Sequence, residues 1–287
     1  MNKLAKRLLT FFIGVPAVFA IIFFLPFYRH LVWNIVVIFF SAVGAVEFSS
    51  MLEKKQLHIS KIEAFILGAL TPLAGTLMVS FNLPEWIFLV TIILGAVWIL
   101  VSRTFSSMEK IENVTNYIAA GSSTFLYPGF FMFWLVKLSD LNNSGLIILF
   151  LLITFGSDAI AWLTGSLFGK NNRGIIPVSP NKSIAGFIGG LIISIILIGV
   201  AVYIAPSVFV VRMDFIPVPL IIAIFGICMG LSTALGDLAE SAIKRSCGVK
   251  DSGTLMQGRG GILDTIDSVA VAAPVYYALF NVFFINP

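Results

Sequence analysis

Charged side chains gather in one stretch of an otherwise apolar chain, residues 236–268, GDLAESAIKRSCGVKDSGTLMQGRGGILDTIDS. Its nine charged residues are Asp237, Glu240, Lys244, Arg245, Lys250, Asp251, Arg259, Asp264 and Asp267. Side chains at i, i+3, i+4 and i+7 share one face of a helix. Four polar residues follow that spacing, namely Asp237, Glu240, Ser241 and Lys244. Asp264 and Asp267 repeat the i, i+3 spacing on the next predicted helix.

If the two faces meet, three or four carboxylates converge beside several cations. Carboxylate oxygens with few histidines or thiols nearby suit Mg²⁺ rather than zinc, and lysines and arginines beside them suit phosphate. The alternative is that these charges only cap and solvate a membrane loop, each acid pairing with a base. Buried acids at helix ends of an apolar protein are costly and usually functional, which favours the first interpretation.

Composition assigns the chain to the membrane proteins. Hydrophobic residues make up 59% of its 287 residues, and the mean hydropathy is +1.02, far above the values of soluble domains. We therefore expect an all-α, polytopic integral membrane protein of about nine transmembrane helices, the first retained rather than cleaved as a signal. The predicted spans are 8–27, 31–52, 62–81, 85–102, 113–136, 144–168, 184–206, 217–243 and 263–284.

Basic residues predict the orientation, because cytoplasmic loops are rich in lysine and arginine. In the nine-helix arrangement, three of the 18 basic residues, Arg29, Lys137 and Arg212, lie on the side opposite the N-terminus. The other 15 lie on the N-terminal side, which predicts a cytoplasmic N-terminus and a cytoplasmic 236–268 stretch. This bias, together with contact with anionic lipid, accounts for the net charge of +4, so no nucleic-acid partner is expected.

The two halves of the chain differ in chemistry. Residues 1–110 hold few polar groups inside their spans, and we expect them to form a scaffold, with a homodimer contact left open. Glu47 is expected to mark a membrane boundary there. Residues 111–287 are expected to form the catalytic region.

Two features lead into that catalytic region. Asp158 lies among apolar residues near the end of a span, where an acid indicates function or a structural hydrogen bond. The loop after it offers Ser179, Lys182 and Ser183 just before a new helix, which suits a phosphate. Helix capping alone would explain Ser183 equally well.

Together these segments resemble the CDP-diacylglycerol synthases, also called phosphatidate cytidylyltransferases, over roughly residues 155–270. The polar positions of the family's C-terminal signature are matched in register by Ser241, Lys244, Arg245, Lys250, Asp251, Gly258, Gly260, Gly261, Asp264, Asp267 and Ser268. The family's Ser-Pro-x-Lys loop is matched by Ser179, Pro180 and Lys182. Its earlier Asp with a following aromatic is matched by Asp158 and Trp162.

The resemblance implies that the chain converts CTP and phosphatidic acid into CDP-diacylglycerol and pyrophosphate at the cytoplasmic side of the inner membrane. It implies a Mg²⁺ cofactor on Asp237, Asp264 and Asp267, with a second cation left open. The residues assigned to catalysis are Asp237, Lys244, Asp264 and Asp267. Those assigned to substrate binding are Ser179, Lys182, Ser241, Arg245, Lys250, Asp251 and Arg259. Asp158 and Glu240 are assigned supporting places beside them.

The chain departs from the family pattern at four positions, Ala185, Gln257, Arg259 and Thr265. Arg259 stands where the family has a histidine, and Thr265 where it has an arginine. Two alternatives follow. One is CTP-dependent transfer to another membrane lipid, such as an isoprenoid phosphate or alcohol. The other, from a different class, is a transporter that uses Asp158 as its coupling residue.

Overall fold

The computed structural model describes residues 10–213, 215–256 and 260–285, which form helices joined by loops. No β-strand occurs among these residues, only isolated bridges. The α-helices are α2 (Val15–Phe24), α3 (Phe27–Leu52), α4 (Lys61–Phe81), α5 (Trp86–Val101), α6 (Met108–Glu112), α7 (Val114–Thr124), α8 (Phe131–Lys137), α9 (Ser144–Phe168), α10 (Ile184–Ile204), α11 (Val218–Ser246) and α12 (Leu263–Phe283). Short π and 3₁₀ segments are η1 (Thr10–Gly14), η2 (Glu53–Lys55), η3 (Phe125–Phe130) and η4 (Leu138–Leu141). The predicted all-α class is confirmed.

Seven helical segments among the described residues are long and apolar enough to cross a membrane. They are Phe27–Lys55, Lys61–Phe81, Val114–Leu141, Ser144–Phe168, Ile184–Ile204, Val218–Ser246 and Leu263–Phe283. The predicted spans 8–27 and 85–102 correspond to shorter apolar helices, Phe12–Phe24 and Trp86–Val101. The 16 residues of α5 rise about 24 Å, less than the roughly 30 Å of hydrocarbon. The protein is thus polytopic, with seven of nine predicted spans matched by helices of full length.

The chain divides into two compact units. The first unit comprises Met1–Asp140 and Lys244–Ile266, and the second comprises Leu141–Ile243 and Asp267–Pro287. The segment that joins α11 to α12 therefore belongs with the N-terminal helices. The predicted functional division into a scaffold, 1–110, and a catalytic region, 111–287, stays a prediction.

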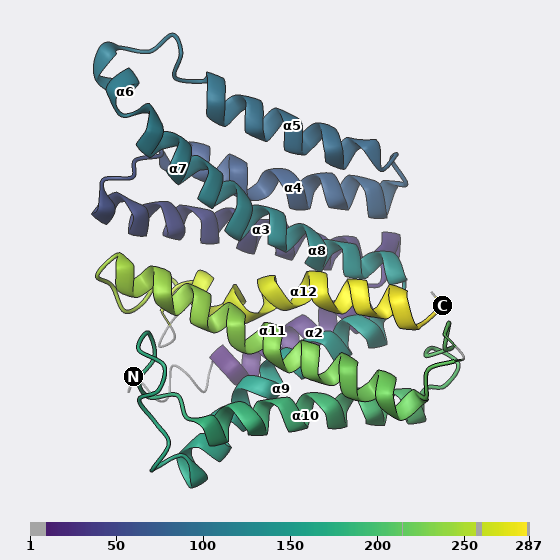
Figure 1. Ribbon diagram of the computed structural model, residues 1–287. Helices are drawn as coiled ribbons and strands as arrows, with labels where there is room; N and C mark the ends of the chain where they lie inside the picture. The colour runs from purple at the N-terminus through teal and green to yellow at the C-terminus, as the bar shows by residue number, and fades with distance from the viewer. Residues whose placement is uncertain (1–9, 214, 257–259, 286–287) are drawn as a thin grey trace. The chain divides into compact units, whose positions relative to one another are not determined.

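In the first unit, α3 and α4 lie side by side (Figure 1). A Cβ atom on Gly68 would come within 2.8 Å of the Ser41 carbonyl, so this glycine lets the two backbones approach closely. The Ser41 hydroxyl donates to the carbonyl of Gly68 at 2.6 Å, and it also contacts the Pro128 carbonyl of η3. Small residues and hydroxyl-to-backbone hydrogen bonds are typical of helix contacts in lipid, where hydrophobic burial contributes little.

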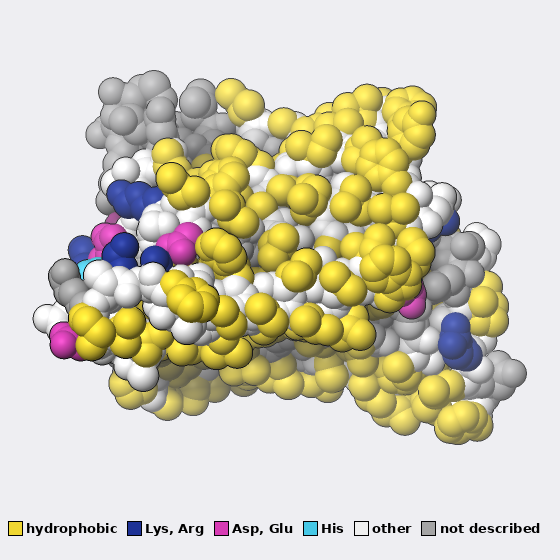
Figure 2. All heavy atoms as spheres, turned by 90° about the horizontal axis from the view of Figure 1, so that it is seen from above, with side chains coloured by type: hydrophobic (Ala, Val, Ile, Leu, Met, Phe, Trp, Pro, Cys, Tyr) yellow, Lys and Arg dark blue, Asp and Glu magenta, His cyan; other side chains and the backbone are white. Residues whose placement is uncertain are grey.

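Charged side chains at the ends of the N-terminal helices include two ion-paired groups. Arg103 donates to both carboxylate oxygens of Glu63, at 2.8 and 3.1 Å, and lies over the ring of Tyr117. Asp140 accepts from Arg29 at 2.8 Å and from Lys137 at 2.7 Å. Figure 2 shows hydrophobic side chains over most of the viewed face, with charged ones towards its ends. This distribution fits a protein embedded in lipid.

In the second unit, α10 packs along α9, and glycines bring helices together. A Cβ atom on Gly226 of α11 would come within 2.7 Å of the Ile195 backbone nitrogen of α10. One on Gly236 would come within 2.6 Å of the Asp267 carbonyl of α12. The second of these contacts holds Asp237, the next residue of α11, beside the start of α12.

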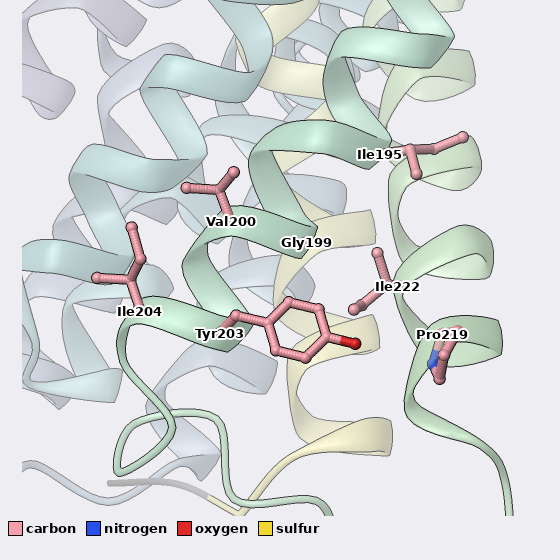
Figure 3. A pocket seen from close by; sticks show the side chains of 7 residues that line it. All are labelled: Ile195, Gly199, Val200, Tyr203, Ile204, Pro219 and Ile222. Atoms are coloured by element: carbon pink, nitrogen blue, oxygen red, sulfur yellow. The ribbon is translucent and has the colours of Figure 1, made fainter.

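An apolar cavity of about 540 Å³ lies between α10 and α11 (Figure 3). Its walls are Ile195, Gly199, Val200, Tyr203, Ile204, Pro219 and Ile222, with Tyr203 and Ile222 facing each other. Ile222 and Asp237 are separated along α11 by about 22 Å at 1.5 Å per residue. None of the seven residues that line the cavity is charged.

Candidate functional site

Carboxylates from three helices of the second unit act on one another. Asp158 of α9 experiences the charges of Asp267 on α12, Asp237 on α11 and Lys182 in the loop before α10. The Lys182 ammonium lies 2.6 Å from the Asp237 carboxylate. Asp158 is exposed, Asp237 and Lys182 are about one-third exposed, and Asp267 is buried. Of the carboxylates predicted to converge, Asp237 and Asp267 thus lie in one cluster, which Asp158 joins from α9, whereas Asp264 belongs to the first unit.

The carboxylates of this second-unit cluster supply oxygen donors, the ligand type that a hard divalent cation prefers. No three carboxyl, imidazole or thiol side chains among the described residues are spaced to hold one ion. Asp237 is instead paired with Lys182. Its other oxygen accepts from the Ser241 hydroxyl at 3.3 Å, so these two predicted residues do share a face.

Glu240 and Lys244, predicted on the same face of α11, have different surroundings. Glu240 is fully buried, and its supporting assignment stays a prediction. Lys244 lies in the last turn of α11, within the first unit, and its ammonium is 2.6 Å from Asp264. Both members of this pair are partly buried, with side-chain exposures of 12% and 7%. The Lys244 ammonium is thus ion-paired with a carboxylate and largely shielded from solvent.

Asp264 closes the loop between α11 and α12. One of its oxygens accepts from Lys244, and the other accepts from the Gly261 amide at 2.7 Å. That second oxygen also accepts from the amide and hydroxyl of Ser252, at 2.8 and 2.9 Å. Charge-assisted hydrogen bonds of this kind are strong, and a carboxylate in the first turn of α12 is favoured by the helix dipole. Asp264 therefore joins the end of α11, the following loop and the start of α12 by hydrogen bonds, and its role as a metal ligand stays a prediction.

Glu47 of α3 takes part in the same network, a contact that the expected membrane boundary did not include. Its side chain is buried, at 7% exposure. One carboxylate oxygen accepts from the Leu263 amide at 3.0 Å and from the Ser252 hydroxyl at 3.3 Å. Sequence reasoning missed this residue because its partners lie more than 200 positions away. The only local signal is an acid within an apolar helix.

The loop after α9 combines helix capping with the Lys182 contact. Ser183 is the N-cap of α10 and accepts from the Gly186 amide at 3.1 Å, so the capping interpretation is confirmed for Ser183. Arg173 donates to the Gly165 carbonyl near the end of α9. Ser179 is half-buried, and its carbonyl accepts from the Lys182 amide at 3.0 Å. These bonds hold Lys182 at the start of α10.

The remaining predicted binding residues are exposed or fall outside the described part of the chain. Arg245, Lys250 and Asp251 are exposed, and Arg245 donates weakly to the Val249 carbonyl at 3.5 Å. The assignment of Arg259 lies outside the described residues. The structure thus shows two groups of predicted residues, Lys182 with the second-unit carboxylates and Lys244 with Asp264.

Comparison with known proteins adds the family. The cytidylyltransferase family matches residues 5–283. A phosphatidate cytidylyltransferase of Bacillus subtilis strain 168 is 30% identical over 291 residues, covering 99% of this chain and 100% of that protein. Proteins of the same name from Staphylococcus aureus strain COL and Staphylococcus haemolyticus are 30% and 35% identical. The alignment covers 91% of this chain and 95% of the former, and 62% of this chain and 64% of the latter. Because the match runs through every helix and loop described above, the chain belongs to the cytidylyltransferase family.

Proposed function

We propose that the protein transfers a cytidylyl group from CTP to phosphatidic acid, forming CDP-diacylglycerol and pyrophosphate for phospholipid synthesis. The observation that carries this proposal is the end-to-end similarity to the phosphatidate cytidylyltransferase of Bacillus subtilis. The polytopic helical architecture fits a substrate that stays in the bilayer. The carboxylates and lysines of the two groups fit polyanionic substrates and a divalent cation.

The proposed reaction requires no proton transfer to or from a side chain of the protein. An oxygen of phosphatidic acid forms a bond to the α-phosphorus of CTP, while the bond from that phosphorus to the bridging oxygen breaks and pyrophosphate leaves. A phosphate monoester is largely ionised at neutral pH, since its second pKa is about 6. No general base is required, and the protein's task is to hold two polyanions together and offset their charge.

The side chains divide this task. Asp237 and Asp267 would hold Mg²⁺, and the assignment of Asp264 to the metal stays a prediction. Bound Mg²⁺ supplies positive charge that stabilises the transferring phosphoryl group. Lys182 and Lys244 bind phosphate oxygens by exchanging a carboxylate partner for a substrate oxygen. Arg245 and Lys250, which are exposed, attract the triphosphate.

The acceptor lipid is the point at which the nearest alternative differs. An isoprenoid alcohol would have to lose a proton, whereas phosphatidic acid and an isoprenoid phosphate would not. The relatives that match most of the chain carry the name phosphatidate cytidylyltransferase, which favours a phosphate acceptor.

A lipid exchange tests this choice. With CTP and Mg²⁺ held constant, we expect phosphatidic acid in mixed micelles to support pyrophosphate release and an isoprenoid alcohol to support none. An isoprenoid phosphate distinguishes recognition of the phosphate alone from recognition of diacylglycerol. Faster turnover with either isoprenoid than with phosphatidic acid would replace the proposed acceptor.

We further propose that the protein lies in the inner membrane with the loops 169–183 and 247–262 in the cytoplasm, where CTP is available. The bias of basic residues supports this orientation. If α10 and α11 both cross the membrane, these two loops would lie on one side of it. A homodimer contact through the N-terminal helices remains part of the proposal.

Cysteine labelling in intact cells tests the orientation. Thr254→Cys should react only after a reagent enters the cytoplasm, whereas Ser207→Cys, one span away and also exposed, should react with an impermeant maleimide from outside. Labelling of both from one side would contradict the arrangement. Burial raises the pKa of the native Cys247 thiol, although Lys54 and Lys55 oppose this shift, so it should add little background. Cys228→Ala removes the other thiol.

A further inference from the structure

Glu47 lies where an N-terminal helix meets the loop that carries predicted binding residues. It projects from α3, while Lys250 and Asp251 lie in the loop between α11 and α12, and Asp264 opens α12. All of these belong to the first unit. Resting on the proposed function, we propose that Glu47 is a positioning residue that holds this loop, and through it Asp264, in the geometry needed for cytidylyl transfer.

The first step of the argument is the end of a helix. The first amides of a helix have no partner within it, and they need an acceptor from elsewhere. The first amide of α12, that of Leu263, donates to Glu47 at 3.0 Å. The next, that of Asp264, donates to the Ser252 hydroxyl at 3.3 Å. Glu47 therefore caps α12 from a different helix, which fixes where α12 begins.

The second step is the link from Glu47 to Asp264. The Ser252 hydroxyl lies 3.3 Å from a Glu47 oxygen and 2.9 Å from an Asp264 oxygen, so its single proton can be donated to either acid. The Ser252 amide donates to the same Asp264 oxygen at 2.8 Å. Movement of Glu47 would release both the hydroxyl and the Leu263 amide, and it would thereby loosen the contacts that orient Asp264.

The third step is the close fit of the loop around the carboxylate. A Cβ atom on Gly253 would lie 2.7 Å from the Glu47 carboxyl carbon, and one on Gly261 would lie 2.6 Å from it. Gly44 of α3 leaves room for the side chain of Ile266, near the start of α12. A Cβ atom on Gly44 would lie 3.3 Å from that side chain. The loop backbone therefore encloses Glu47, and a side chain at position 253 has no room while Glu47 is present.

This fit gives a double-mutant test that does not depend on activity. Hydrogen exchange of peptides from 247–256 and 260–266 should be about tenfold faster in Glu47→Ala and in Gly253→Ala than in the wild type. Gly253→Ala should add little to Glu47→Ala, because the clash has been removed. Equal effects of Gly253→Ala in both backgrounds, or unchanged exchange in Glu47→Ala, would overturn the proposal.

Kinetics then test whether the position matters for catalysis. Glu47→Ala should lower kcat/KM for CTP by about 10- to 100-fold, the usual loss for residues that orient a metal ligand. Glu47→Gln retains an acceptor for the Leu263 amide and should recover part of the loss. Faster exchange with unchanged kinetics would reduce Glu47 to a structural residue. If the wild-type protein folds and shows the expected hydrogen exchange but no cytidylyl transfer, the proposed function is contradicted, whereas the structural contacts of Glu47 are not.

A matched control is Glu63, a partly buried acid of the same unit that belongs to the capping box of α4 and pairs with Arg103. Glu63→Ala should lower thermal stability without changing the exchange of the α11–α12 loop or kcat/KM. If Glu47→Ala does not fold, Gly253→Ala and Glu47→Gln carry the test. Normal loop exchange and kinetics in both of those variants would overturn the proposal.

Discussion

Asp237→Asn and Asp267→Asn are each expected to lower cytidylyl transfer by roughly 100- to 1,000-fold while the protein stays folded. Asparagine keeps the size of the side chain but removes the charge that would offset Mg²⁺ and balance Lys182. In Asp237→Asn, the Lys182 ammonium also loses its 2.6 Å partner. Initial rates with CTP and phosphatidic acid, at several Mg²⁺ concentrations, measure the loss.

Asp140→Asn is the control for these two variants. Asp140 is partly buried and pairs with lysine and arginine, as Asp237 pairs with Lys182, but it belongs to no predicted functional group. It should change stability at most. Near-normal, Mg²⁺-dependent turnover in folded Asp237→Asn and Asp267→Asn would remove both residues from the metal assignment.

Lys244→Ala is expected to lower kcat/KM for CTP by roughly 100-fold, because it removes a cation that would bind phosphate and leaves Asp264 buried without its charge partner. Loss of one member of a buried ion pair also costs about 3–5 kcal/mol of folding stability. Rates must therefore be measured at a temperature at which the variant is shown to be folded.

Lys137→Ala is the control that separates the loss of kcat/KM from the loss of folding stability. Lys137 is 13% exposed and lies 2.7 Å from Asp140, whereas Lys244 is 12% exposed and lies 2.6 Å from Asp264. Both variants should lose stability, but only Lys244→Ala should lose kcat/KM. Equal kinetic losses would mean that the cations of the 236–268 stretch only stabilise a loop.

Hydropathy was enough to predict the all-α class and most membrane spans. Unpaired backbone N–H and C=O groups are costly in lipid, and a helix pairs them within one segment. Apolar composition alone did not distinguish a full-length span from a shorter helix, as α2 and α5 show. Helical spacing correctly placed Asp237 with Ser241, one turn apart.

Contacts between distant segments were beyond such reasoning. Nothing near Glu47 in the sequence indicates that its acceptor oxygen meets the Leu263 amide, 216 positions away. The i, i+3 spacing of Asp264 and Asp267 likewise predicted a shared face, but their hydrogen bonds differ. Asp264 is saturated by the loop and Lys244, whereas one Asp267 oxygen accepts from the next amide, that of Ser268, at 2.6 Å. Local periodicity predicts the helix face on which a side chain lies, whereas its hydrogen-bond partners depend on tertiary packing.

Pyrophosphate release by the purified wild-type protein tests the central claim most directly. With CTP, Mg²⁺ and phosphatidic acid in mixed micelles, we expect equal amounts of pyrophosphate and a cytidine-labelled lipid, and neither product when phosphatidic acid is omitted or Mg²⁺ is chelated. Folded protein that forms no cytidine-labelled lipid from CTP and phosphatidic acid would contradict the proposed function.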